Sequence, residues 1–229
     1  MMHPALYGEE GAYSTGFVTR VKVEEQDPCP VLWKTPLGEI WGRLDDEQTL
    51  AFLLTEQLVW RVYDHESVSV APGDIVLDNG SHLGTFTQFA MKRGAQQVIA
   101  FEPEPTNISC FKRTFSGELR NGKVALVEAG AWHSSDTLTF QRNAFSATGH
   151  VKDQGWSNEW DFYVEDFPVQ AVTIDDQVEK LGLNKVDLIK VDIEGAERHA
   201  LAWKIHKVSK RRAASTVLAR LCLRGAPQA

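Results

Sequence analysis

Short apolar runs alternate with helical patterns along the middle of the chain. Ile75, Val76 and Leu77 form the first run, and Val98 begins the second. Apolar runs of this length, bounded by turn residues, are typical of buried strands, whereas apolar residues three or four positions apart indicate helices. Strands that alternate with helices predict an α/β fold whose parallel sheet has helices on both faces. The expected strands are residues 75–77, 98–101, 124–127, 169–174 and 186–191, with helices around 86–90, 108–119 and 175–181.

A different pattern precedes this alternating region. Residues 31–44 contain Pro36 and Gly38 between two short apolar segments, which predicts a hairpin. Five apolar residues then lie on one face of an expected helix, at offsets 0, 3, 4, 8 and 12: Leu50, Leu53, Leu54, Leu58 and Val62. We therefore expect residues 1–70 to form an N-terminal extension of hairpin and helix, residues 71–203 to form the core, and residues 204–229 to form a tail.

The expected tail differs from the rest of the chain in charge. No Asp or Glu follows Glu197, whereas seven Lys or Arg residues lie between Lys204 and the C-terminus. The 26 residues after Trp203 have room for one strand at most beside a helix and its connections, and residues 215–223 are the one apolar candidate. We therefore expect a chain that is incomplete at its C-terminus, truncated or shifted in reading frame after about Trp203. A genuine basic helix is the alternative.

Composition narrows the possible partners of the chain. Its 229 residues include 24 Lys and Arg against 31 Asp and Glu, a net charge of −7, which argues against binding nucleic acid through its phosphates. A small-molecule substrate is expected instead. Cys29, Cys110 and Cys222 are not the pattern of a disulfide framework, and no apolar segment is long enough for a membrane span or a secretion signal. These features predict a cytoplasmic protein, and the histidine spacing predicts no metal site.

The first motif that carries chemistry is the loop after the first expected strand. Asp78, Gly80 and Gly84 have the spacing D-x-G-x-x-x-G between a strand and a helix. Glycines at such a turn let the backbone approach a ligand at the strand ends, although a purely structural turn is the alternative. Glu102 ends the next strand, 24 residues after Asp78, where an acid can accept hydrogen bonds from ribose hydroxyls. Together they predict an adenosine-containing cofactor, with Glu104 a solvated acid at a helix start.

The second motif is the last expected strand. Alternation places Lys190 and Asp192 on the same side of it, with Asp192 near its C-terminal end. A lysine in an apolar strand needs a partner, so we expect Lys190 to contact a carboxylate. That contact could serve catalysis or only structure.

Taken together, these segments resemble the FkbM-type S-adenosylmethionine-dependent methyltransferases. The resemblance rests on Pro-Gly-Asp-Ile-Val-Leu-Asp-Asn-Gly at 72–80, Phe-Glu-Pro at 101–103, residues 187–197, and Trp-Lys-Thr-Pro-Leu-Gly at 33–38. It implies the Rossmann-like fold of class I methyltransferases, S-adenosyl-L-methionine as cofactor, and O-methylation of a hydroxyl on a sugar, polyketide or lipid-linked metabolite. By the same resemblance Asp78, Gly80, Ser81, His82 and Gly84 shape the cofactor loop, Glu102 holds the ribose, Ala131 and Trp132 lie beside the adenine, and Lys190, Asp192 and Glu194 line the reaction side.

One position departs from the family pattern. The first loop of the family usually reads Gly-Ala-Asn, where this chain has Gly80, Ser81 and His82. His82 could replace the amide as a hydrogen-bond donor or act as a base, because imidazole titrates near neutrality. Asp192 remains the expected base for the acceptor hydroxyl.

The long segment 141–168 is expected to be a connection that sets substrate specificity. It contains Asn143 and Ser146, which we expect to contact the substrate, together with several aromatic residues. A satellite aromatic cluster is the alternative. For the whole chain, the competing hypotheses are a binding module that keeps the fold without turnover and a nicotinamide-dependent oxidoreductase, which the D-x-G-x-x-x-G spacing disfavours.

Overall fold

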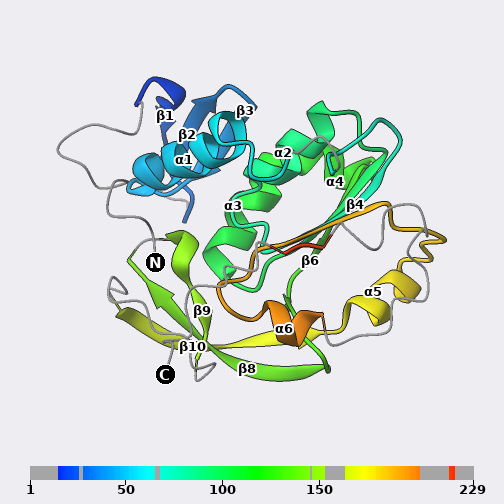
Figure 1. Cartoon of the computed structure of the whole chain (residues 1–229). Coiled ribbons are helices and arrows are strands. Elements are labelled where there is room, and N and C mark those ends of the chain that lie inside the picture. The colour runs from blue at the N-terminus through cyan, green and yellow to red at the C-terminus, as the bar shows by residue number, and fades with distance from the viewer. Residues whose placement is uncertain are drawn as a thin grey trace, which may run out of the picture.

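The computed structural model describes residues 15–25, 28–64, 68–144, 146–152, 163–201 and 217–219. Figure 1 shows two small sheets and a central sheet with helices between and around them. The strands are β1 (Thr19–Val23), β2 (Val31–Thr35), β3 (Gly38–Gly42), β4 (Ile75–Asn79), β5 (Gln97–Phe101), β6 (Val124–Val127), β7 (Gly130–Ala131), β8 (Asp136–Asn143), β9 (His150–Val151), β10 (Tyr163–Val172), β11 (Leu188–Val191) and β12 (Val217–Ala219). The helices are α1 (Asp46–Leu54), α2 (Thr85–Lys92), α3 (Pro105–Thr114), α4 (Ser116–Arg120), α5 (Ile174–Lys180) and α6 (Glu197–Ala200), with short turns η2 (Thr15–Phe17), η3 (Thr55–Val59) and η4 (Ser146–Thr148).

The central sheet is fully parallel, which confirms the predicted fold class. Its strands lie in the order β12-β11-β4-β5-β6, and every neighbouring pair is parallel. The chain therefore builds outward from β4 through β5 to β6, then returns to the other side of β4 with β11 and β12. The order reverses between β4 and β11. In open α/β sheets this switch point, at the C-terminal ends of the strands, is where ligands bind.

Both faces of the central sheet are covered, as its continuously apolar strands require. In Figure 1, α2 and α3 lie above the sheet, with α1 and β1–β3 beyond them, and α5 and α6 lie below it. Val76 points into the upper core with Phe86 and Phe111, whereas Leu77 packs in the lower core with Ile174. Successive strand residues thus alternate between two apolar layers, which fixes the register of the strand relative to both.

The predicted N-terminal hairpin is confirmed, and the helix after it is shorter than the spacing indicates. β2 and β3 pair antiparallel from Val31 opposite Gly42 to Thr35 opposite Gly38, and β1 extends this sheet. The α-helix ends at Leu54 and continues as one π-helical turn to Val59. Val62 therefore lies beyond the helix.

The cysteine prediction is wrong for two of the three residues. Cys29, just before β2, forms a disulfide with Cys110 of α3, with the two Cα atoms 5.3 Å apart. Both residues are fully buried. The pair was not foreseen because a separation of 81 residues carries no local signal. The argument for a reducing compartment from cysteine usage therefore does not hold, and the cytoplasmic location stays a prediction.

The expected connection 141–168 contains strand residues of a second small sheet, so that prediction needs correction. β8 runs through Asn143, and β10 begins at Tyr163 and pairs antiparallel with β8. The sheet order is β7-β10-β8-β9. The expected strand 169–174 covers only the second part of β10, and Pro168 lies before it. Pro168 is tolerated because β7 pairs only at Ala171 and Val172, so the side of β10 beside Pro168 is an edge among the described residues.

The C-terminal region is described over three residues only. β12 pairs parallel with β11, which confirms a strand within the predicted segment 215–223. The rest of the expected tail, from residue 204 to 216 and from 220 onward, lies outside the described residues. Among the residues that are described, no helix has the length and apolar character needed to cross a lipid bilayer.

Candidate active site

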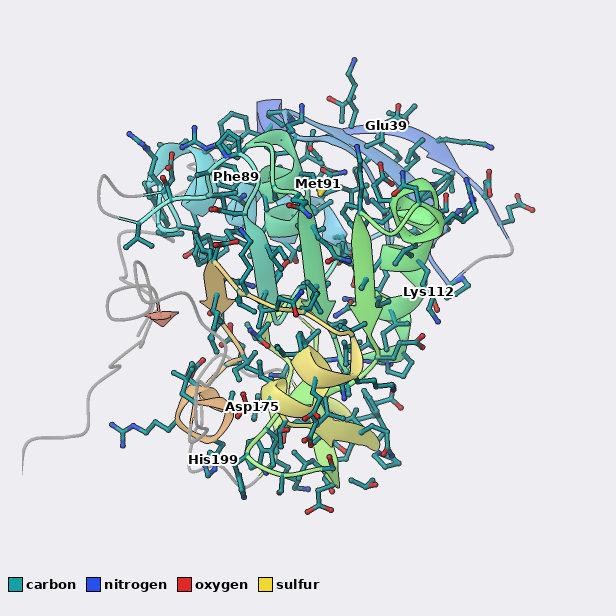
Figure 2. The ribbon with its side chains drawn as sticks, turned by 90° about the vertical axis from the view of Figure 1, so that its right-hand side faces the viewer. Glu39, Phe89, Met91, Lys112, Asp175 and His199 are labelled. Carbon is teal, nitrogen blue, oxygen red and sulfur yellow. A yellow bond between two sulfur atoms is a disulfide. The ribbon has the colours of Figure 1, made fainter. Side chains whose placement is uncertain are left out.

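A pocket of about 600 Å³ opens at the C-terminal ends of the central strands, including the part open to solvent. In Figure 2 the arrows of the parallel strands run downward, toward the second small sheet near Asp175 and His199. The pocket lies between these strand ends and that sheet. Its lining comprises Gly80, His82, Phe101, Glu102, Pro103, Asn107, Gly130, Ala131, Phe140, Ser146, Ala147, Gly149, Val151, Asp192, Ile193, Glu194 and Ala196.

Gly80 is the residue that lets the first loop reach this pocket. It has a φ of +79°, and a Cβ there would lie 2.1 Å from the carbonyl oxygen of Asp192. No side chain can therefore replace its hydrogen without moving the turn after β11. The amides of Gly80 and Ser81 both donate to the carbonyl of Phe101, which ties the loop to the end of β5.

Glu102 lies in the wall of the pocket and is almost completely buried. Its carboxylate accepts hydrogen bonds from the amide of His82 (2.8 Å), the amide of Glu104 (3.0 Å) and the side-chain nitrogen of Asn107 (3.2 Å). Burial raises the pKa of Glu102 to about 7, and these hydrogen bonds act in the opposite direction. Three donors leave about one of the four lone-pair positions of a carboxylate for a ligand.

The expectation that Glu104 is solvated is wrong, although it does start a helix. Its side chain is buried, accepts a hydrogen bond from the amide of Asn107 (2.6 Å) and forms an ion pair with Arg142 of β8. Glu104 is therefore the N-cap of α3, and it also ties α3 to the second small sheet. Pro105 occupies the first turn of this helix, where no intrahelical amide donor is needed.

The predicted contact between Lys190 and a carboxylate is confirmed. Its Nζ lies 3.1 Å from Oδ1 of Asp78 and donates to the carbonyl of Gly80 at 2.6 Å. Burial lowers the pKa of Lys190, but the charges of Asp78 and Asp192 raise it by more, so its pKa lies above the ordinary value. Asp78 also accepts a hydrogen bond from Thr87 of α2 (2.7 Å). Neither Lys190 nor Asp78 lines the pocket. This buried pair therefore supports the loop through the hydrogen bond from Lys190 to the carbonyl of Gly80.

His82 belongs to a hydrogen-bonded chain that starts in the N-terminal extension. Ser146 donates its hydroxyl hydrogen to Asp46 of α1 (2.7 Å), so Nε2 of His82 must donate to Ser146 (3.0 Å). Burial, with a smaller contribution from the charge of Arg43, lowers the pKa of His82 to about 3. The imidazole is therefore neutral near pH 7 and a weak base. Of the two roles considered for His82, the arrangement favours hydrogen bonding.

Asp192 and Glu194 lie in the turn after β11 and line the pocket. The amide of Asp192 donates to the carbonyl of Asn79 (3.2 Å), which fixes the turn against β4. The hydroxyl of Tyr63 donates to Oδ2 of Asp192. Glu194 has a φ of +51°, and the carboxylate of Glu197 caps the turn by accepting from the amides of Ile193 and Gly195.

The structure brings about half of the predicted site residues into the pocket. Seven line it, namely Gly80, His82, Glu102, Ala131, Ser146, Asp192 and Glu194. Six lie outside its lining, namely Asp78, Ser81, Gly84, Trp132, Asn143 and Lys190.

Three of the residues outside the lining have identifiable structural surroundings. Trp132 is buried and stacks on His199 of α6, with ring centroids 4.2 Å apart and an interplanar angle of 12°. Asn143 donates to the carbonyl of Thr148 (2.9 Å) and so supports the turn that carries Ser146. A Cβ on Gly84 would lie 2.3 Å from the ring of Phe115, so this glycine permits helix packing.

Sequence reasoning missed three residues that contribute to the site. Tyr63 and Asp46 come from the N-terminal extension, and Asn107 follows Glu102 by five residues. Asn107 carried a weak signal, because it lies one turn into a helix that starts beside Glu102. The other two carried none, since each lies more than 90 residues from its partner. In the described part of the chain, no group of three or more His, Cys, Asp or Glu side chains is arranged to hold a metal ion.

Comparisons with known proteins agree in the family they indicate. The chain is 25% identical over 174 residues to the 31-O-demethyl-FK506 methyltransferase FkbM of Streptomyces tacrolimicus, covering 66% of this chain and 67% of that protein. It is 29% identical over 171 residues to Methyltransferase 1 of Beauveria bassiana, covering 66% and 65%. It is 26% identical over 130 residues to the hexuronic acid methyltransferase AglP of Haloferax volcanii, covering 56% and 48%.

A solved structure and a family model complete the comparison. A crystal structure of methyltransferase FkbM from Methylobacillus flagellatus matches 70% of this chain and 40% of its own, with 16% identity and a TM-score of 0.40. The chain spans about two thirds of the length of the first two curated relatives and about half of the third. The model of the methyltransferase FkbM domain matches residues 78–218, well over half of the sequence. The chain therefore belongs to the FkbM methyltransferase domain family.

Proposed function

We propose that this protein is an S-adenosylmethionine-dependent methyltransferase that methylates a hydroxyl group of a small molecule. The observation that carries the proposal is the buried carboxylate of Glu102 in the wall of a pocket at the switch point of a parallel sheet. An acid at the end of the second strand of such a sheet can accept hydrogen bonds from a ribose. Membership of a methyltransferase family supports a methyl donor as the occupant.

The pocket residues fit an adenosine-containing cofactor. Gly80 leaves no room for a side chain between the first loop and Asp192, so the backbone itself forms that wall. Glu102 has about one lone-pair position left for a ribose hydroxyl, and Ala131 offers an apolar surface for the base. When bound, the cofactor supplies an electrophilic methyl carbon on a leaving group that departs uncharged.

The remaining chemistry is positioning and the removal of one proton. In this proposal the oxygen of the acceptor hydroxyl bonds to the methyl carbon, and Asp192 accepts the proton that the hydroxyl loses. Lys190 stays charged, because its pKa is raised, and holds the carbonyl of Gly80, so it fixes the loop and takes no proton. Correct placement is worth up to about 7–11 kcal/mol, and a positioned base about 10²- to 10⁴-fold.

The names of the relatives support an oxygen acceptor. One acts on a 31-O-demethyl compound, and another on a hexuronic acid. The lining of the pocket adds one constraint, because its charged members among the described residues are Glu102, Asp192 and Glu194, all acidic. The lining itself therefore favours an uncharged hydroxyl compound over an anion such as a hexuronic acid.

Thermal unfolding with three ligands tests the proposal against its alternatives. A ligand at about 100 times its Kd stabilises a protein by about 2.7 kcal/mol. We expect S-adenosylmethionine and S-adenosylhomocysteine to raise Tm and NAD to leave it unchanged. A rise with NAD alone would support an oxidoreductase. A rise with S-adenosylhomocysteine but no transfer to any acceptor in a broad metabolite screen would support a non-catalytic module.

The affinity for S-adenosylhomocysteine should increase with pH up to about 7. Because burial raises the pKa of Glu102 to about 7, the carboxyl is mostly protonated at pH 6 and must ionise to accept ribose hydroxyls fully. Below pH 7 each unit should weaken binding by up to about tenfold. Calorimetric titrations from pH 6 to 8 measure this. Glu102→Gln should bind more weakly and lose the pH dependence, and an equal dependence in both proteins would assign it to another group.

A further inference from the structure

Tyr63 connects the N-terminal extension to the reaction side of the pocket. Its hydroxyl donates to Oδ2 of Asp192, which lies 129 positions later in the chain. The tyrosine is only 6% exposed, and among the described residues Oδ1 of Asp192 has no hydrogen bond. One oxygen of the expected base is therefore held by the protein, and the other is left for an acceptor.

The surroundings of Tyr63 fix its ring. The ring meets Phe86 of α2 edge-on, with centroids 5.3 Å apart, and the Nζ of Lys190 lies 5.8 Å from the ring centroid. The next residue, Asp64, forms ion pairs with Arg61 (2.9 Å) and with Arg93 after α2 (2.7 Å). The hydroxyl is thus delivered by a segment attached to the central fold, and its position does not depend on the hydrogen bond to Asp192 alone.

We propose that Tyr63 is a positioning residue that orients the carboxylate of Asp192 for proton removal from the acceptor hydroxyl. This inference rests on the proposed function, since it assigns Asp192 as the base. The hydrogen bond fixes the rotation of the carboxylate. The N-terminal extension is thereby part of the catalytic apparatus, although the first family-matched residue is Asp78.

The test compares Tyr63→Phe with a matched control. The phenylalanine keeps the contact with Phe86 and removes only the hydroxyl. The control is Trp60→Phe, which alters the same segment through a ring that faces Phe52 at 6.2 Å and does not touch Asp192. The readouts are kcat and KM for methyl transfer and the calorimetric affinity for S-adenosylhomocysteine.

With an acceptor found by screening, kcat of Tyr63→Phe should fall about threefold to tenfold, because the carboxylate of Asp192 is no longer held in one orientation. KM and the affinity for S-adenosylhomocysteine should not change, and Trp60→Phe should keep the kcat of the parent.

Two results would overturn the inference. One is an unchanged kcat in Tyr63→Phe. The other is an equal fall of kcat in Tyr63→Phe and Trp60→Phe, which would assign the effect to the structure of the segment and not to the hydroxyl. Failure of the proposed function is a separate result, because the parent would then not bind S-adenosylhomocysteine.

Discussion

Asp192→Asn should lower kcat by about 10²- to 10⁴-fold, the contribution expected of a positioned general base. The amide keeps the size of the carboxylate and can still accept the hydrogen bond from Tyr63, but it cannot take the proton of an acceptor hydroxyl. We expect the affinity for S-adenosylhomocysteine and Tm to stay close to those of the parent. The measurement is transfer from methyl-labelled cofactor to an acceptor identified by screening.

Asp136→Asn is a suitable control, because this exposed aspartate at the start of β8 loses the same charge outside the pocket. It should keep full activity. If Asp192→Asn instead lost cofactor binding or unfolded, the residue would serve the structure of the Lys190 cluster. Retention of full kcat would exclude Asp192 as the base.

Cys29→Ser should lower the free energy of unfolding by about 4 kcal/mol. The disulfide joins positions 81 residues apart and therefore closes a long loop, which restricts the unfolded chain. It also ties the N-terminal sheet to α3, the helix whose first turn supports Glu102 through Asn107. Urea unfolding of oxidised and reduced protein measures the effect.

The disulfide prediction has an internal control. Cys110→Ser and the double variant should be as unstable as Cys29→Ser, and a reductant should destabilise the parent but none of the three. Cys222→Ser should not lower stability by a comparable amount. Equal stability of the parent with and without reductant would show that the two sulfurs are not bonded in solution.

The fold of this chain was predictable where the signal is local. The apolar runs at β4 and β5 are buried on both faces, and the run at β6 is half-buried, so all three stand out without reference to any other segment. The turn at Gly80 and the acid at Glu102 were found for a related reason: each follows directly from the end of a strand. Residues at strand ends share one edge of a parallel sheet, so sequence position alone brought them together.

The rest depended on contacts between distant segments. Trp132 lies outside the pocket lining and stacks on His199, a contact that depends on where α6 packs. β8 and β10 alternate only weakly between buried and exposed residues, and the end of β8 and the first part of β10 were taken for a connection. Tyr63 lies in a segment without any motif. Its hydrogen bond to Asp192 becomes visible only when the N-terminal extension is placed against the end of β11.

The most direct test of the account is a calorimetric titration of the full chain with S-adenosylhomocysteine, comparing the parent with Glu102→Ala at pH 8. Glu179→Ala, an exposed glutamate on α5, serves as the control. We predict that the parent and the control bind one molecule per chain with equal affinity. Glu102→Ala should bind about 1.5 to 3 kcal/mol more weakly, the value of hydrogen bonds to a charged acceptor. No binding by the parent, or equal binding by all three proteins, would contradict a cofactor site at Glu102.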